Sequence, residues 1–254
     1  MNTGFSEHEA EQISDLSWYN DKVLNNIIIE NYSSFSIIDK DSWILDIGCG
    51  VGLMCNELQK IFKNYTGIDN SIHMINKAWK KDFSVCNNIE FIEIDILSYL
   101  ESDIFPKQIS HILLKNVLQF LDLETLLFSM RKALPNGFTC QIVQTINDNN
   151  QPDLFKLLYC LDFVKRVKKF YKKAEIVETV IEYGYNILDV NNKYIQTVLL
   201  DDWLNYHGVS KKQYYDTYKI LSKLTENELN DYNIFEKDNK LYITRKLTII
   251  TFSC

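Results

Sequence analysis

Apolar residues recur along the chain with two different spacings, and these spacings predict strands and helices in alternation. Apolar positions three and four residues apart predict helices at 53–62, 72–81 and 123–134. Strands that alternate with helices pair in parallel, so the pattern predicts an α/β fold, a doubly wound Rossmann-like sheet with helices on both faces. Short apolar runs predict the buried strands at 43–47, 65–69, 89–94, 109–114 and 138–146.

The flanking segments show the same two patterns. Residues 7–32 and 153–183 have apolar positions at helical spacing, and 185–190 is predicted as a further strand. The final run, 241–252, is rich in Ile, Thr, Tyr and Phe and is predicted to be β structure.

Residues 200–234 are predicted to be mostly helical. Two capping-box patterns support this prediction, because a Ser or Thr followed three residues later by Gln or Glu can satisfy the first N–H groups of a helix. One box pairs Ser210 with Gln213, and the other pairs Thr225 with Glu228.

These elements predict one large domain with a helical cap. The length of 254 residues fits this division. We expect a helical cap over 1–40 and one domain over 41–254, with a core at 41–146, a helical and lid region at 147–235 and a C-terminal strand region at 236–254.

Composition narrows the class of protein further. Hydrophobic residues make up 46% and charged residues 24%, which is typical of a globular protein. The first fifteen residues are polar and acidic and show no secretory signal pattern, which favours a cytoplasmic location. No apolar run is long enough to span a membrane. The net charge of −7 disfavours a general nucleic-acid binder. The six cysteines form no C-x-x-C pair, so we expect free thiols and no metal site.

The segment with the clearest chemistry is a glycine-rich turn after the first predicted strand. Four of the eight glycines fall between 48 and 67, and Gly48, Gly50 and Gly52 alternate directly after the strand. Such a turn lets a ligand lie against bare backbone and leaves N–H groups free at the start of the next helix. Asp69 ends the second strand and Asp95 ends the third, so both acids lie at the same edge of the sheet, where doubly wound folds bind ligands.

The spacing distinguishes between ligands. The nicotinamide fingerprint is G-x-G-x-x-G, whereas the third glycine here comes one residue earlier and Asp46 precedes the turn. An acid in that position suits an ammonium group better than a diphosphate. Asp69 could accept hydrogen bonds from two ribose hydroxyls. The implied ligand carries an amine, a carboxylate and a ribose.

Asp46-x-Gly48-x-Gly50-x-Gly52, together with Asp69 and Asp95, resembles the class I S-adenosylmethionine-dependent methyltransferases. The resemblance covers roughly 41–146 and implies S-adenosyl-L-methionine as the cofactor and a seven-stranded sheet whose last strand is reversed. It also implies roles for individual residues. The methionine part of the cofactor would lie against Asp46, Gly48, Cys49, Gly50 and Gly52, the ribose against Asp69, and the adenine against Asn70, Met74, Asp95 and Ile96. Asn116 would flank the methionine chain and the substrate.

Tyr19 lies where this family often covers the cofactor, with Trp18 before it. Ordinary helix packing is the alternative for both aromatic residues.

The resemblance also implies the reaction, an in-line displacement that moves a methyl group to an O or N atom of a small molecule or modified peptide. Residues 115–119 lack the Asn/Asp-Pro-Pro-aromatic motif of enzymes that methylate nucleobase amines. His207 is the histidine best placed to act as a general base. An aromatic lid could contact the substrate through Trp203, Tyr206, Tyr214 and Tyr218, or these residues could simply pack the insert on the sheet.

Two alternative functions remain at this point. The basic run 165–173 predicts either a solvated helix face or a phosphate-binding track, and the second would make the protein an RNA methyltransferase. A catalytically silent cofactor-binding scaffold is the other alternative. The sequence does not specify the oligomeric state.

Overall fold

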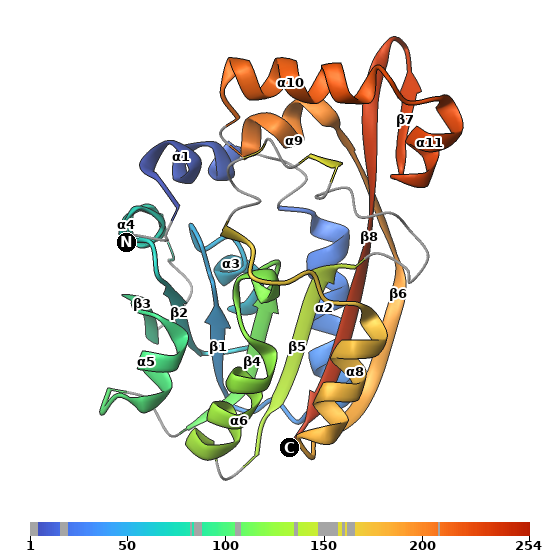
Figure 1. The fold of residues 1–254 in the computed structure, drawn as a ribbon. Coiled ribbons are helices and arrows are strands. Elements are labelled where there is room, and N and C mark those ends of the chain that lie inside the picture. The colour runs from blue at the N-terminus through green and yellow to red at the C-terminus, as the bar shows by residue number, and fades with distance from the viewer. Residues whose placement is uncertain are drawn as a thin grey trace.

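The computed structural model describes residues 5–15, 20–81, 83, 88–104, 108–134, 137–146, 157–158, 161, 166–207 and 209–254. The strands in this part of the chain form one sheet (Figure 1). They are β1 (Trp43–Ile47), β2 (Asn64–Asp69), β3 (Asn88–Glu93), β4 (Ile109–Lys115), β5 (Thr139–Thr145), β6 (Asn186–Leu199), β7 (Ile234–Lys237) and β8 (Lys240–Ser253).

The order across the sheet is β3-β2-β1-β4-β5-β8-β6, with β7 paired to β8 outside this path. Strands β1 to β5 pair in parallel, and β8 runs antiparallel between β5 and β6. The predicted doubly wound α/β sheet and its reversed last strand are therefore confirmed. This path contains the seven predicted strands, and among the described residues β7 adds an eighth. The additional strand, β7, joins β8 through a tight turn at Asp238 and Asn239, both of which have positive φ angles.

Helices cover both faces of the sheet (Figure 1). One apolar core lies under α2, α3 and α4, and the other lies under α5, α6 and α8. A third apolar cluster joins α9 and α10 to the protruding ends of β6 and β8. The helices are α1 (Glu7–Asp15), α2 (Lys22–Phe35), α3 (Cys55–Leu58), α4 (Ile72–Trp79), α5 (Ile96–Glu101), α6 (Leu123–Ala133), α8 (Lys173–Glu182), α9 (Leu200–Tyr206), α10 (Lys211–Leu221) and α11 (Glu226–Asp231), with a 3₁₀ turn η1 at Leu118–Phe120.

Several predicted helices differ in extent from the observed ones. The predicted helix 7–32 is two helices, since Asp21 caps a new helix by accepting hydrogen bonds from the N–H groups of Val23 and Leu24. The predicted helix 53–62 is regular only over α3, and turns flank it. Both predicted capping boxes, at the starts of α10 and α11, are confirmed.

The carboxyl ends of the parallel strands are covered by chain segments from both ends of the sequence. Helix α1 lies over this edge and contacts both α4 and α9 (Figure 1). Strand β6 continues to Leu199, beyond the predicted 185–190, and so carries α9 to the same edge. None of the described helices is long and apolar enough to cross a membrane.

Candidate active site

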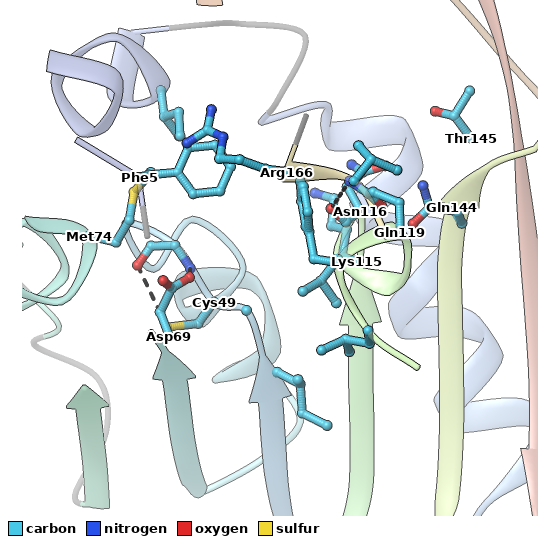
Figure 2. Close-up of a pocket in the computed structure, with 18 of the residues that line it drawn as sticks. Phe5, Cys49, Asp69, Met74, Lys115, Asn116, Gln119, Gln144, Thr145 and Arg166 are labelled. Atoms are coloured by element: carbon cyan, nitrogen blue, oxygen red, sulfur yellow. Dashed lines mark hydrogen bonds between the residues drawn. The ribbon is translucent and has the colours of Figure 1, made fainter. Parts of the chain in front are cut away.

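A cavity of about 560 Å³ lies at the carboxyl ends of β1, β2, β4 and β5. Its wall includes the glycine turn after β1 and the acidic ends of β2 and β3. Helix α9 and the segment before α1 complete the wall from the other side. Figure 2 shows Phe5, Met74 and Asp69 at one side of the cavity and Gln144 and Thr145 at the other.

The glycine turn is fixed to the neighbouring strand by its backbone. The N–H groups of Gly48 and Cys49 both donate to the carbonyl oxygen of Ile68, at 2.8 and 3.0 Å. Gly48 has a φ angle of 69°, and a Cβ added there would lie 2.6 Å from a methyl carbon of Val117. Only glycine fits this position without displacing the loop after β4.

Gly52 differs from the other two glycines of the turn. Gly48, Gly50 and Cys49 line the cavity, whereas Gly52 is absent from its wall. A Cβ at Gly52 would lie 3.0 Å from the ring of Phe91. Gly52 therefore leaves room for the Phe91 side chain on β3, and its assignment to cofactor contact stays a prediction.

Asp69 is buried and already oriented by two backbone groups. Its Oδ2 accepts from the N–H of Gly50 at 3.1 Å, and its Oδ1 accepts from the N–H of Ser71 at 2.9 Å. Burial raises the pKa of Asp69 to about 6, against the lowering effect of the two hydrogen bonds. A carboxylate offers about four acceptor positions, so two remain for hydroxyl groups of a ligand.

Asp46 and Lys115 place opposite charges at the ends of adjacent strands. Both line the cavity, and both are buried. Asp46 accepts from the hydroxyl of Tyr65 at 2.8 Å, and burial raises its pKa to about 6. Lys115 donates to Asn25 Oδ1 at 3.0 Å and to Met54 Sδ at 3.3 Å. Burial lowers the pKa of Lys115 to about 8, while the charge of Asp46 opposes this shift. The pair can bind a group that is itself both positive and negative.

The residues expected near the adenine lie together in the cavity wall. Asp95 is also the N-cap of α5, since its Oδ1 accepts from the N–H groups of Leu97 and Ser98. Its other carboxylate oxygen, Oδ2, accepts neither of these two hydrogen bonds. The expected residues that line this part of the cavity are Asn70, Met74, Asp95 and Ile96.

Helix α1 covers this part of the cavity through an ion pair. Arg166 contacts both carboxylate oxygens of Glu9, and its guanidinium carbon lies 4.6 Å from the centre of the Phe5 ring. The hydroxyl of Ser71 donates to the Phe5 carbonyl at 2.6 Å, which ties the same segment to the end of β2. Trp18 and Tyr19, which were expected to cover the cofactor, lie outside the described residues.

The predicted aromatic lid is only partly at the cavity. Trp203 and His207 both line it, with their ring centres 4.8 Å apart. Tyr214 and Tyr218 are absent from the cavity wall, because they stack on each other and donate their hydroxyls to Asp201. Their assignment to substrate contact stays a prediction that this cavity does not support. Tyr206 lies in α9, but its side chain is outside the described part of the structure.

His207 has an environment that keeps its imidazole neutral. Burial lowers its pKa well below the usual range, and the positive charges of Arg245 and Arg166 lower it further. A neutral imidazole can accept a hydrogen bond from the molecule that is to be methylated, but it is a weak base.

Arg245, which the sequence analysis did not single out, lines the cavity near the end of β5. Arg245 on β8 donates from Nε and Nη2 to Thr145 Oγ1, at 3.1 and 2.7 Å, and from Nη1 to Gln196 Oε1 at 3.1 Å. Its Nη2 also lies 3.4 Å from Oδ1 of Asn116. Asn116, which was expected at the site, has a φ angle of 56°. Asparagine adopts this left-handed conformation more readily than most other non-glycine residues.

The basic run 165–173 is not a helix over the described residues 167–172. The N–H groups of Lys168 and Lys169 donate to the carbonyl of Gln119, and Lys169 pairs with Glu175. Arg166 and Lys168 line the cavity. The predicted basic helix face is therefore wrong, because these cations are divided between the cavity wall and local ion pairs.

The part of the chain that the structure describes contains no group of three or more His, Cys, Asp or Glu side chains that could hold a metal ion. Among the described cysteines, Cys49, Cys55, Cys140 and Cys254 are free thiols.

Comparisons with known proteins give the class. A family model described as "Methyltransferase domain" matches residues 44–137, which include the glycine turn, Asp69 and Asp95. No curated protein matches the chain. The YcgJ protein from Bacillus subtilis is similar in fold, with a TM-score of 0.70 and 15% identity over 90% of this chain and 96% of that one.

Two further solved structures share the fold. A SAM-dependent methyltransferase from Aquifex aeolicus has a TM-score of 0.54 and 15% identity, over 74% of this chain and 93% of that one. The geranyl diphosphate C-methyltransferase from Streptomyces coelicolor, solved with Mg²⁺, geranyl diphosphate and S-adenosyl-L-homocysteine, has a TM-score of 0.59 and 12% identity, over 98% of this chain and 83% of that one.

The matched domain, the fold and the geometry agree. Residues 44–137 form a methyltransferase domain, and the chain has the fold of S-adenosylmethionine-dependent methyltransferases. It is an enzyme, and its cofactor is S-adenosylmethionine.

Proposed function

We propose that the chain transfers a methyl group by in-line displacement to an O or N atom of a small molecule or a modified peptide. The observation that carries this proposal is a cavity of about 560 Å³ whose wall includes both Asp69 and Asn116. This volume is typical of sites for small ligands. A cofactor and a small acceptor can therefore meet in one cavity.

The cofactor would lie along the ends of β1, β2 and β3. Asp46 would accept from its ammonium group, Lys115 would donate to its carboxylate, and Asp69 would accept from the ribose hydroxyls. The remaining contacts would come from Gly48, Cys49 and Gly50 along the methionine chain and from Asn70, Met74, Asp95 and Ile96 around the adenine. When bound, S-adenosylmethionine supplies an electrophilic methyl group on a sulfonium centre.

The protein would act mainly by alignment and exclusion of water. Well-oriented reacting groups reach effective molarities of roughly 10⁵–10⁸ M, so positioning can supply much of the rate. Asn116 and His207, which both line the cavity, would orient the acceptor. His207 would accept a hydrogen bond from an acceptor O–H or N–H, and its low pKa means that it would not hold the proton as a strong base.

The three alternative functions are supported by different observations. A carbon acceptor is supported only by analogy, because a protein of similar fold is a C-methyltransferase. The RNA methyltransferase was based on a basic helix, and the described residues 167–172 are not helical. A catalytically silent scaffold would bind the cofactor without turnover.

Methyl-labelled S-adenosylmethionine tests the proposal directly. The enzyme is incubated with a cell extract that has been divided into low-molecular-weight, RNA and protein fractions. We expect label in a low-molecular-weight product that is separated by chromatography from S-adenosylmethionine, and much less of this product with the Asp69→Ala variant. Label only in RNA, or only in intact proteins, would contradict the proposal, and cofactor binding without any transfer would support the scaffold.

A further inference from the structure

Two glutamines in the cavity wall have side-chain oxygens that the surrounding protein leaves unsatisfied. The Oε1 atoms of Gln119 and Gln144 are buried and have no hydrogen-bond partner in the part of the chain that the structure describes. Both residues line the cavity, and in Figure 2 both lie with Asn116 on the side away from Asp69. A buried acceptor without a partner costs free energy, so these two oxygens indicate where a bound molecule would place donors.

The amide of Gln119 is held in one orientation by the loop after β4. Its Nε2 donates to the carbonyl oxygen of Asn116 at 2.9 Å. Its backbone carbonyl accepts from the N–H groups of Lys168 and Lys169, at 2.9 and 3.3 Å, which fixes the main chain as well. An amide turned the other way would place two oxygens against each other, so Oε1 is the atom that is left for a ligand.

Gln144 is directed to the same side of the sheet by the alternation of side chains along β5. Ile142 and Ile146, two residues to either side of it, pack in one core cluster with Leu118 of η1. Side chains two residues apart on a strand share a face, so Gln144 faces the side on which η1 lies. Gln119 is the central residue of η1. The two unsatisfied oxygens therefore belong to one part of the cavity.

The segments next to the two glutamines add mainly apolar surface and positive charge to the wall. The apolar residues are Phe120, Val167 and Phe170, which all line the cavity. An acceptor that reaches the glutamines would therefore have an apolar or aromatic body.

The charged side chains that segment 166–170 contributes to the wall, Arg166 and Lys168, are both cations. The two glutamine oxygens are uncharged. An ammonium group buried against them would lose its hydration without gaining a counter-charge from this segment. A neutral O–H or N–H group can donate to the same oxygens without this cost.

We propose that Gln119 and Gln144 recognise the acceptor through neutral hydrogen-bond donors, and that the acceptor is an apolar or aromatic molecule with hydroxyl or amide N–H groups. This inference deepens the proposed function and rests on it. Solvent in the cavity can bond to the two oxygens, and an acceptor that displaces it must supply equivalent donors or lose affinity. The two glutamines are therefore specificity-determining residues.

The test measures the binding of small probes by ligand-observed NMR. The protein is first titrated with S-adenosylhomocysteine, and the saturated complex is then titrated with two pairs of probes. Benzamide is paired with acetophenone, in which a methyl group replaces the amide NH₂. Resorcinol is paired with 1,3-dimethylbenzene, in which methyl groups replace both hydroxyls. Each pair keeps its shape and loses its donors.

The variants are Gln119→Met and Gln144→Met, which remove the amide and keep a side chain of similar length. The matched control is Gln141→Met. Gln141 lies on the same strand as Gln144 and also has a buried Oε1 without a partner among the described residues, but it is absent from the cavity wall.

We expect the donor probe of at least one pair to bind the wild-type complex, with an affinity that falls about fivefold or more in Gln119→Met and in Gln144→Met, as a hydrogen bond is lost. The affinity for the partner without donors should stay within about twofold. Gln141→Met should bind all probes as the wild type does. The pair with the larger effect would indicate whether the site prefers N–H or O–H donors. Every variant should keep its affinity for S-adenosylhomocysteine within about twofold, since these residues lie outside the proposed cofactor contacts.

Four outcomes would overturn the inference. The first is no binding of either donor probe to the wild-type complex, and the second is unchanged donor affinity in either glutamine variant at the wall. The third is an equal loss in Gln141→Met, and the fourth is a loss of S-adenosylhomocysteine affinity in Gln119→Met or Gln144→Met, which would make that glutamine a cofactor residue. By contrast, failure of the wild type to bind S-adenosylhomocysteine in the first titration would contradict the proposed function itself.

Discussion

The backbone N–H of Gly50 donates to Oδ2 of Asp69 across 3.1 Å, and this bond joins the glycine turn after β1 to the end of β2. The acid is therefore oriented before any ligand arrives. A preorganised carboxylate loses less conformational entropy on binding than a mobile one. The same bond explains why the glycine motif and the acid, nineteen residues apart, act as one unit.

A pH dependence follows from the two buried acids. Burial raises the pKa of Asp46 and of Asp69 to about 6, so both are neutral at pH 5 in the free protein. Binding of S-adenosylhomocysteine uses their ionised forms, so its affinity should be constant just above pH 7 and fall steeply below pH 6. Each required ionisation adds a slope of about tenfold per pH unit.

The ligand 5′-methylthioadenosine provides the control, because it lacks the amino acid part that Asp46 would bind. Its affinity should fall below pH 6 with about half the logarithmic slope of S-adenosylhomocysteine. Affinities of both ligands that stay flat to pH 5 would contradict the assigned roles of the two acids.

Lys115 is predicted to recognise the carboxylate of the cofactor. The Lys115→Met variant keeps the buried volume near Met54 but removes the charge. We expect its affinity for S-adenosylhomocysteine to fall by about tenfold or more, because a hydrogen bond to a charged group contributes about 1.5–3 kcal/mol. The affinity for 5′-methylthioadenosine should be unchanged. Equal losses for both ligands would show a structural effect rather than recognition of the carboxylate.

The glycines of the turn should differ in how they tolerate alanine. Gly50 and Gly52 both have positive φ angles, so alanine costs about 1–2 kcal/mol at either position. Beyond this, a Cβ at Gly50 meets nothing within 4 Å, whereas at Gly52 it meets the ring of Phe91, which is packed against Tyr65 and Trp79. Overpacking adds about 1–3 kcal/mol.

Urea unfolding of the free protein measures this difference. Gly52→Ala should lower the free energy of unfolding by more than Gly50→Ala does. The reverse order would mean that the packing of Phe91 does not determine the role of Gly52.

Much of this fold could be predicted from the sequence because its determinants are local. The strands β1 to β5 are apolar runs, and Asp46, Asp69 and Asp95 lie at or next to the carboxyl ends of such runs. Helix caps are also local, which is why Ser210 and Thr225 mark the starts of α10 and α11 correctly.

The parts that the sequence did not predict depend on long-range contacts. Arg245 reaches the site because β8 inserts beside β5, which brings it to Thr145, 100 residues away. The basic run has helical periodicity, but the hydroxyl of Tyr171 donates to the carbonyl of Leu121 and accepts from the N–H of Leu123. Such tertiary contacts override a weak local preference for helix.

Helix α1 is predicted to be held over the cavity by the pair of Glu9 with Arg166. Glu9→Gln removes the ion pair, so amide hydrogen exchange in residues 7–15 should accelerate in the free protein. The matched control is Glu11→Gln in the same helix, since Glu11 lies 3.7 Å from Lys77 in an exposed pair that contributes little. Equal exchange rates in the wild type and Glu9→Gln would contradict a role for this pair in closing the cavity.

Binding of S-adenosylhomocysteine to the wild type and to Asp69→Ala, measured by calorimetry, tests the assigned cofactor site most directly. The control Asp122→Ala removes another helix-capping carboxylate, at the start of α6 and outside the cavity wall. We expect binding to the wild type and to Asp122→Ala, and a loss of roughly tenfold to a hundredfold or more in Asp69→Ala, as two hydrogen bonds to a charged acceptor disappear. Unchanged affinity in Asp69→Ala, or no binding to the wild type, would contradict the site described above.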